Sequence, residues 1–93
     1  MLTLYTKKNC GYCLQAKALL NNNNIPYEEV NIELDDAAKN FVINEGHRTM
    51  PQIYFNGKLF VEGGYTGLNG LGVDVIKEKM GIASVDVNSL GTL

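Results

Sequence analysis

The stretch LTLYTKKNCGYCLQAKALL, residues 2–20, carries two cysteines, Cys10 and Cys13, between two segments with different patterns. Residues 2–6 alternate apolar and polar side chains, which is typical of a strand. Over residues 11–22 the apolar side chains recur at spacings of three and four, which predicts a helix. Cys10 is therefore expected just beyond a strand, at the N-terminus of a helix.

A cysteine at this position is favoured as an attacking thiolate. Unpaired backbone N–H groups and the positive end of the helix dipole stabilise the charged sulfur of Cys10. Cys13, one turn further on, lacks this advantage and should be more buried, yet residues i and i+3 share a helix face. We predict that Cys10 attacks a disulfide and that Cys13 resolves the mixed disulfide. Lys7 would add positive charge nearby or meet a substrate carboxylate, although an exposed lysine is usually only solvated.

The remaining patterns predict alternating strands and helices. Residues 27–34 are typical of a strand, and the helical crossover makes it parallel to the first. A second helix should begin at Asp35 or Asp36 and end at Gly46. The pair Asn56-Gly57 lies between two apolar runs, which is a strong signal for an antiparallel hairpin. Apolar residues between 68 and 80 predict one last helix.

The predicted order is β-α-β-α-β-β-α, an α/β fold with a four-stranded mixed sheet flanked by helices. A chain of 93 residues leaves no room for a second core, so we expect one domain over residues 1–81. Residues 82–93 are rich in Gly, Ser and Asn. They are predicted to form a flexible tail, or at most one added edge strand.

Composition narrows the class of function. The net charge is −2 and the basic residues are scattered, which argues against a nucleic-acid partner. No segment approaches the ~18 consecutive apolar residues of a membrane span. Nor does an apolar segment of signal-peptide length follow the first lysines. Two cysteines three positions apart are not the widely spaced framework of secreted domains. We therefore expect a cytoplasmic monomer without a membrane partner.

Two further segments could bind a substrate. Thr49-Met50-Pro51 precedes the predicted third strand, where a cis-proline would present backbone groups of Met50 to an extended peptide, unless the bond is an ordinary trans one. Gly63-Gly64-Tyr65-Thr66 leads into a helix N-terminus suited to a carboxylate, or is only a turn. His47 with the two cysteines falls short of the four ligands of a structural zinc site, so we expect a loop residue.

These motifs together resemble glutaredoxins over roughly residues 2–80. The matching segments are Tyr5-Thr6-Lys7, Cys10-Gly11-Tyr12-Cys13, Ala16 to Leu20, Arg48 to Ile53 and Gly63 to Tyr65. The resemblance implies a thioredoxin-like fold and glutathione-dependent reduction of protein disulfides and of protein–glutathione mixed disulfides. Glutathione would be a co-substrate, with no tightly bound cofactor and no metal.

The resemblance also implies which residues bind glutathione. Lys7 would meet its glycine carboxylate, Tyr12 would line the groove, and Met50 would supply backbone hydrogen bonds ahead of a cis-proline. The full set expected to bind glutathione is Lys7, Tyr12, Thr49, Met50, Pro51, Gly64, Tyr65 and Thr66. The chain departs from the family pattern in three places. Thr66-Gly67 stands where an acidic pair is frequent, Ala37-Ala38-Lys39 stands where the second helix usually supplies a Gln or Arg, and Gly11 stands where the dithiol motif more often has proline.

Two alternatives follow from these departures. The altered turn at Thr66-Gly67 leaves open a redoxin that thioredoxin reductase recharges and that donates electrons to ribonucleotide reductase, since the small chain is similar to viral and bacterial redoxins of that kind. The pair Gly11-Tyr12 leaves open an iron–sulfur carrier. In that hypothesis, Cys10 from two chains and two glutathiones would hold a [2Fe–2S] cluster.

Overall fold

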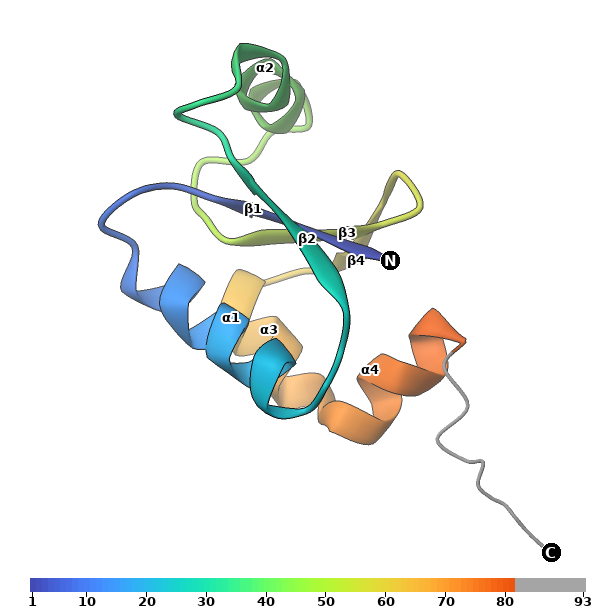
Figure 1. The fold of residues 1–93 in the computed structure, drawn as a ribbon. Helices are drawn as coiled ribbons and strands as arrows, with labels where there is room; N and C mark the ends of the chain where they lie inside the picture. The colour runs from blue at the N-terminus through green and yellow to red at the C-terminus, as the bar shows by residue number, and fades with distance from the viewer. Residues whose placement is uncertain (82–93) are drawn as a thin grey trace, which may run out of the picture.

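The computed structural model describes residues 1–81, and the tail predicted over residues 82–93 lies outside this part of the chain. The described residues form four strands and four helices (Figure 1). In chain order these are β1 (Leu2–Thr6), α1 (Gly11–Asn22), β2 (Tyr27–Asn31), α2 (Asp36–Asn44), β3 (Gln52–Phe55), β4 (Lys58–Val61), α3 (Gly64–Leu71) and α4 (Val73–Met80). None of these helices is long and apolar enough to cross a membrane.

The four strands form one mixed sheet in the order β2-β1-β3-β4. Strand β1 pairs parallel with β2, as a crossover through α1 requires, and antiparallel with β3. The hairpin partner β4 forms the far edge. Helices α1, α3 and α4 lie on one side of the sheet and α2 on the other (Figure 1). The sequence prediction of a thioredoxin-like, four-stranded mixed sheet flanked by helices is confirmed.

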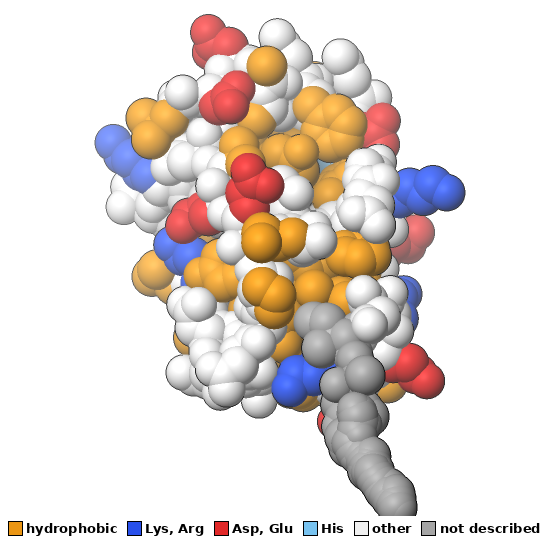
Figure 2. All heavy atoms as spheres, turned by 45° about the vertical axis from the view of Figure 1, so that its right-hand side comes forward, with side chains coloured by type: hydrophobic (Ala, Val, Ile, Leu, Met, Phe, Trp, Pro, Cys, Tyr) orange, Lys and Arg blue, Asp and Glu red, His pale blue; other side chains and the backbone are white. Residues whose placement is uncertain are grey.

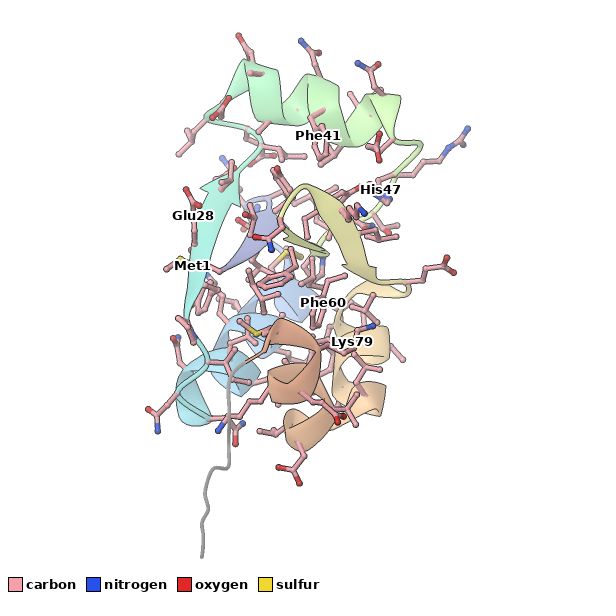
Figure 3. All side chains as sticks on the ribbon, turned by 90° about the vertical axis from the view of Figure 1, so that its right-hand side faces the viewer. Met1, Glu28, Phe41, His47, Phe60 and Lys79 are labelled. Carbon is pink, nitrogen blue, oxygen red and sulfur yellow. A yellow bond between two sulfur atoms is a disulfide. The ribbon has the colours of Figure 1, made fainter. Side chains whose placement is uncertain are left out.

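The sheet separates two apolar clusters of unequal size. The larger one packs α1, α3 and α4 onto the sheet, and its fully buried side chains include Leu2, Leu4, Ala16, Leu20, Ile53, Leu68 and Ile76. The smaller one contains Cys13, Val42 and Met50, with half-buried Tyr5, Cys10, Ile32 and Phe41 packed around them. Phe41 points from α2 toward the sheet (Figure 3). Both cysteines therefore belong to the smaller cluster.

Local signals explain where several elements begin and turn. The Asp35 side chain accepts a hydrogen bond from the Ala38 N–H at 3.0 Å and caps α2, as predicted. Asn56 and Gly57 both have positive φ, at 53° and 81°, which is the backbone of the primed turn that joins twisted antiparallel strands. The hairpin prediction is confirmed.

The second strand is shorter than predicted. It ends at Asn31 instead of residue 34, because the Asn31 side chain accepts a hydrogen bond from the Glu33 N–H at 2.8 Å. The Asn31 carbonyl also accepts one from the Leu34 N–H at 3.0 Å. These bonds turn the chain away from the sheet and leave Leu34 85% exposed.

The prediction of a single last helix over residues 68–80 is wrong. The chain forms α3 and α4, which Gly72 separates with φ 83° and ψ 153°. That backbone is far from helical and is one that glycine adopts readily. The first of the two helices already begins at Gly64, directly after the paired glycines.

Apolar side chains gather along the middle of the face that Figure 2 shows, and most charged side chains lie around them. Basic side chains lie apart from one another on this face and make no continuous stripe (Figure 2). A stripe of that kind is the usual footprint of a phosphate backbone.

Candidate active site

Cys10 and Cys13 are joined by a disulfide at the start of α1, with Cα atoms 5.2 Å apart. Cys10 is the N-cap residue of that helix, with an extended backbone at φ −118° and ψ 102°. Its Sγ accepts a hydrogen bond from the backbone N–H of Cys13 at 3.1 Å. The first turn of α1 contains no acidic residue. This geometry places the Cys10 sulfur where N–H groups and the helix dipole favour negative charge, as predicted.

The two sulfurs differ in access. Cys10 is half-buried, whereas Cys13 is only 2% exposed and packs beside Val42 and Met50. A molecule approaching from solvent can reach Cys10 but not Cys13. The predicted inequality between an outer and an inner cysteine is therefore confirmed in the geometry.

The loop before β3 reaches the cysteine pair. The Met50–Pro51 peptide bond is cis, as the resemblance implied, and not the ordinary trans bond that the sequence pattern alone left open. The Met50 carbonyl oxygen lies 3.6 Å from Cys10 Sγ, which is a contact and not a hydrogen bond while that sulfur is in a disulfide. The Gln52 side chain donates a hydrogen bond to the Thr49 carbonyl at 2.8 Å and thereby holds the loop. Met50 thus joins the cysteines to the pocket beside them.

This pocket has a volume of about 310 Å³ and lies between the starts of α1 and α3 and the loop before β3. It is lined by Tyr12, Thr49, Met50, Pro51, Gln52, Gly63, Gly64, Tyr65 and Thr66. All the residues predicted to bind glutathione line it except Lys7. Lys7 is exposed, directly after β1, and lies outside the lining.

Sequence reasoning missed Gln52 and Gly63 in this lining. Gln52 is a buried polar residue at the first position of β3, where it looked like an ordinary strand residue. Gly63, the N-cap of α3, belonged to the segment expected to bind a carboxylate but not to the set expected to bind glutathione. The close approach of the two walls depends on Gly64, since a Cβ there would lie 2.9 Å from the Pro51 carbonyl oxygen.

Two tyrosines stand side by side in the lining. The rings of Tyr12 and Tyr65 are stacked, with centroids 6.2 Å apart and planes inclined by 22°. None of the described residues that line the pocket carries a charged side chain. Polar contacts inside it must therefore come from hydroxyl and amide groups and from the backbone.

His47 lies in the loop between α2 and β3, as expected, and bonds to a strand residue. Its Nε2 is 2.7 Å from the Tyr54 hydroxyl, which donates to Glu45 Oε1 at 3.2 Å. Burial raises the pKa of Tyr54 to about 12, and the negative charge of Glu45 adds to this shift. Among residues 1–81, no three His, Cys, Asp or Glu side chains converge as a metal site. His47 is thus a structural residue of this loop (Figure 3).

Comparison with known proteins agrees with this geometry. The glutaredoxin family model matches residues 2–60. A Mycobacterium tuberculosis protein described as a glutaredoxin is 50% identical over 56 residues, which cover 58% of this chain and 67% of that protein.

Two solved structures show the same fold at 24% identity. A buckwheat glutaredoxin–glutathione complex has a TM-score of 0.70 and covers 86% of this chain and 76% of its own. The Escherichia coli NrdH-redoxin has a TM-score of 0.57 and covers 59% of this chain and 72% of its own. With its Cys-x-x-Cys pair at the N-terminus of α1, this chain is a thiol redox protein that belongs to the glutaredoxin family.

Proposed function

We propose that this protein is a glutathione-dependent thiol-disulfide oxidoreductase of the cytoplasm. Its substrates would be protein disulfides and mixed disulfides between proteins and glutathione. The observation that carries the proposal is the asymmetric pair: Cys10 caps α1 and is only half-buried, while Cys13 is buried behind it. A pocket of about 310 Å³ adjoins the pair and could hold the group that is bonded to the target sulfur.

In the first half of the reaction the substrate disulfide is reduced and the protein acquires a disulfide. The Cys10 thiolate attacks one sulfur of the substrate disulfide, forms a mixed disulfide and releases the other sulfur as a thiolate, which takes up a proton. Cys13 then loses its proton and attacks Cys10 Sγ, which releases the second substrate thiol. The substrate has gained two electrons and the protein holds the Cys10–Cys13 disulfide, the state that the structure shows.

Glutathione would reverse this oxidation in two steps. One glutathione thiolate attacks Cys10, forms a Cys10–glutathione disulfide and frees Cys13. A second glutathione attacks the glutathione sulfur of that disulfide, so that oxidised glutathione leaves and the Cys10 thiolate returns. A substrate that is itself glutathionylated needs only Cys10, because its glutathione is transferred directly to that sulfur.

Several pocket groups suit a tripeptide thiol. Backbone groups of Met50 could pair with its extended main chain, as a strand edge would. The N–H groups at the start of α3, on Tyr65 and Thr66, could bind its γ-glutamyl carboxylate. Lys7 would approach its glycine carboxylate from outside the lining. The buckwheat structure of the same fold contains glutathione, which supports this assignment.

The test is glutathione-dependent reduction of a glutathionylated peptide and of a protein disulfide, with wild type, Cys10→Ser and Cys13→Ser. We expect Cys10→Ser to be inactive on both. Cys13→Ser should retain substantial turnover of the glutathionylated peptide and lose most of its activity on the protein disulfide. Full activity of Cys10→Ser would overturn the mechanism.

The uncharged lining favours a second candidate, in which thioredoxin reductase recharges the pair. Glutathione carries two carboxylates and an ammonium group, and no charged side chain lines the described pocket to meet them. The E. coli NrdH-redoxin is a glutaredoxin-like protein with a thioredoxin-like activity profile. Ribonucleotide reductase would then be a candidate partner of this chain. Side-by-side turnover with each reductant decides, and failure with thioredoxin reductase removes this candidate.

A [2Fe–2S] cluster held by Cys10 of two chains and by two glutathiones stays a prediction of the resemblance. Its test is anaerobic reconstitution followed by visible absorption and by measurement of the oligomeric state. A colourless monomer would dismiss it.

A further inference from the structure

Two tyrosines from separate helices form one aromatic surface in the pocket wall. Tyr12 is the second residue of α1 and Tyr65 is the second residue of α3, and these helices run side by side (Figure 1). Their stacked rings both line the pocket. Stacking at this distance is one of the favourable geometries of aromatic pairs.

The two rings are held in different ways. Tyr65 is half-buried and packs against the larger apolar cluster. Tyr12 is 59% exposed, and the ring that it stacks on is that of Tyr65. Tyr65 is therefore the anchor that orients the exposed ring of Tyr12.

This surface lies next to the reacting sulfur. Tyr12 stands between the two cysteines in the chain, and Met50 lines the same pocket while its carbonyl oxygen touches Cys10 Sγ. A peptide bonded through its cysteine to Cys10 must place the residues beside that cysteine near the pocket. The neighbour of the target cysteine can thus contact the stacked rings.

The chemistry of the wall discriminates between such neighbours. An apolar or aromatic side chain would bury area against the rings and gain free energy. A side-chain carboxylate placed against the ring faces, away from the N–H groups at the start of α3, would lose hydration, and no cationic side chain in the described lining would replace it. Lys7 and Lys8 are exposed and lie outside the lining.

We propose that the stacked pair Tyr12–Tyr65 is a specificity-determining surface, which favours disulfides whose cysteine is preceded by an apolar or aromatic residue over those preceded by an acidic one. This inference rests on the proposed thiol-disulfide exchange at Cys10 but not on the identity of the reductant. It assigns to the Tyr65 ring a role in choosing the protein substrate.

The experiment measures a single turnover, so that no reductase or glutathione is needed. The protein is reduced with dithiothreitol, desalted, and mixed with one of two disulfide peptides that differ only in the residue before the cysteine, Leu or Glu. The rate is measured against peptide concentration, which separates the half-saturating concentration from the limiting rate. For the wild type we expect a preference for the Leu peptide of about fivefold to tenfold, mainly in the half-saturating concentration.

Tyr65→Ser and Tyr12→Ser should each lower this preference to less than about twofold. The double variant should lower it no further, because the rings act as one surface. Tyr65→Phe, which keeps the ring, should restore it. Leu14→Ser is the matched control: Leu14 lies on the same helix, is 63% exposed against 59% for Tyr12, and does not line the pocket. The control should keep the full preference.

A small symmetrical disulfide without side chains, bis(2-hydroxyethyl) disulfide, serves as a control substrate. It distinguishes failure of the exchange at Cys10 from failure of the specificity role of the ring pair. If the wild type reduces neither this compound nor the peptides, the exchange at Cys10 fails and the proposed function fails with it. If it reduces them all and Tyr12→Ser keeps the wild-type preference, the specificity role of the ring pair is overturned. Tyr12 is exposed, so this arm of the test holds even if Tyr65→Ser does not fold.

Discussion

The backbone N–H of Cys13 donates a hydrogen bond to Cys10 Sγ at 3.1 Å, so the sulfur of Cys10 caps the helix that it begins. An N-cap is normally the place of a Ser, Thr, Asp or Asn oxygen, which satisfies one of the free N–H groups. Here the capping atom also belongs to the more accessible member of a redox pair. Capping and activation of the thiolate are therefore one interaction.

The first prediction concerns selective alkylation of the reduced protein. With less than one equivalent of iodoacetamide at neutral pH, Cys10 should react before Cys13. The helix N-terminus stabilises its thiolate by up to ~1 kcal/mol, a factor of about five, and the burial of Cys13 adds to the difference. Peptide mass spectrometry measures the two modified fractions. Equal labelling of the folded protein would contradict the prediction, and the urea-unfolded protein, in which the two should react alike, is its control.

The second prediction concerns Gly67, in the first half of α3. A Cβ at this position would overlap the carbonyl oxygen of Glu62. Glu62 directly precedes Gly63 of the pocket lining. Gly67→Ala should therefore lower the free energy of unfolding by about 2–3 kcal/mol. Gly70→Ala in the same helix is the matched control, because a Cβ there meets nothing, and it should gain up to about 1 kcal/mol. Urea denaturation measures both, and equal stabilities would refute the steric argument.

Sequence patterns predicted the elements whose signals are local. The turn at Asn56-Gly57 and the cap at Asp35 each depend on a few adjacent residues, and the structure forms both as predicted. The break at Gly72 was missed because apolar spacing continues on both sides of it, and one glycine inside such a pattern is usually tolerated. Periodicity alone cannot show that this glycine leaves the helical backbone.

Site residues could be predicted where they belong to a recognisable sequence motif. They could not be predicted where only the tertiary fold brings them to the site. The cysteine pair and Met50-Pro51 came from motifs, and they meet as expected. Gln52 enters the lining only because its side chain holds the Thr49 carbonyl, and no pattern in the sequence encodes that bond. Gly67 was noted as a departure from the family. The structure supplies a physical reason for a glycine at this position, because a Cβ there would overlap the Glu62 backbone. The sequence alone does not show this contact.

The third prediction concerns Gly11, the first residue of α1. Proline is favoured at this position, since its N–H has no helical partner and its φ is fixed near the helical value. Cys10 before it already has an extended backbone, which proline requires, and a Cβ at position 11 meets nothing. Gly11→Pro should raise the free energy of unfolding by about 0.4–1 kcal/mol by restricting the unfolded chain. Thermal denaturation checks it, and a loss of stability would show that the backbone at position 11 does not suit proline.

The last prediction concerns stability at alkaline pH. Tyr54 is 2% exposed and its pKa is raised to about 12, chiefly by burial and further by Glu45. In the unfolded chain the phenol has an ordinary pKa of about 10. Between pH 10 and 12 the unfolded state therefore binds fewer protons than the folded state. The stability associated with the neutral phenol is fully present below pH 10 and declines as the pH rises toward 12, by about 2–3 kcal/mol in total.

Tyr54→Phe isolates this contribution, because phenylalanine does not titrate. The variant loses the hydrogen bonds to His47 and Glu45 and should be less stable at pH 8. Its free energy of unfolding should fall less steeply than that of the wild type between pH 10 and 12. Burial also raises the pKa of Tyr5, which titrates in both proteins. Parallel curves for the two proteins over this range would show that the buried Tyr54 hydroxyl does not hold its proton more tightly in the folded state.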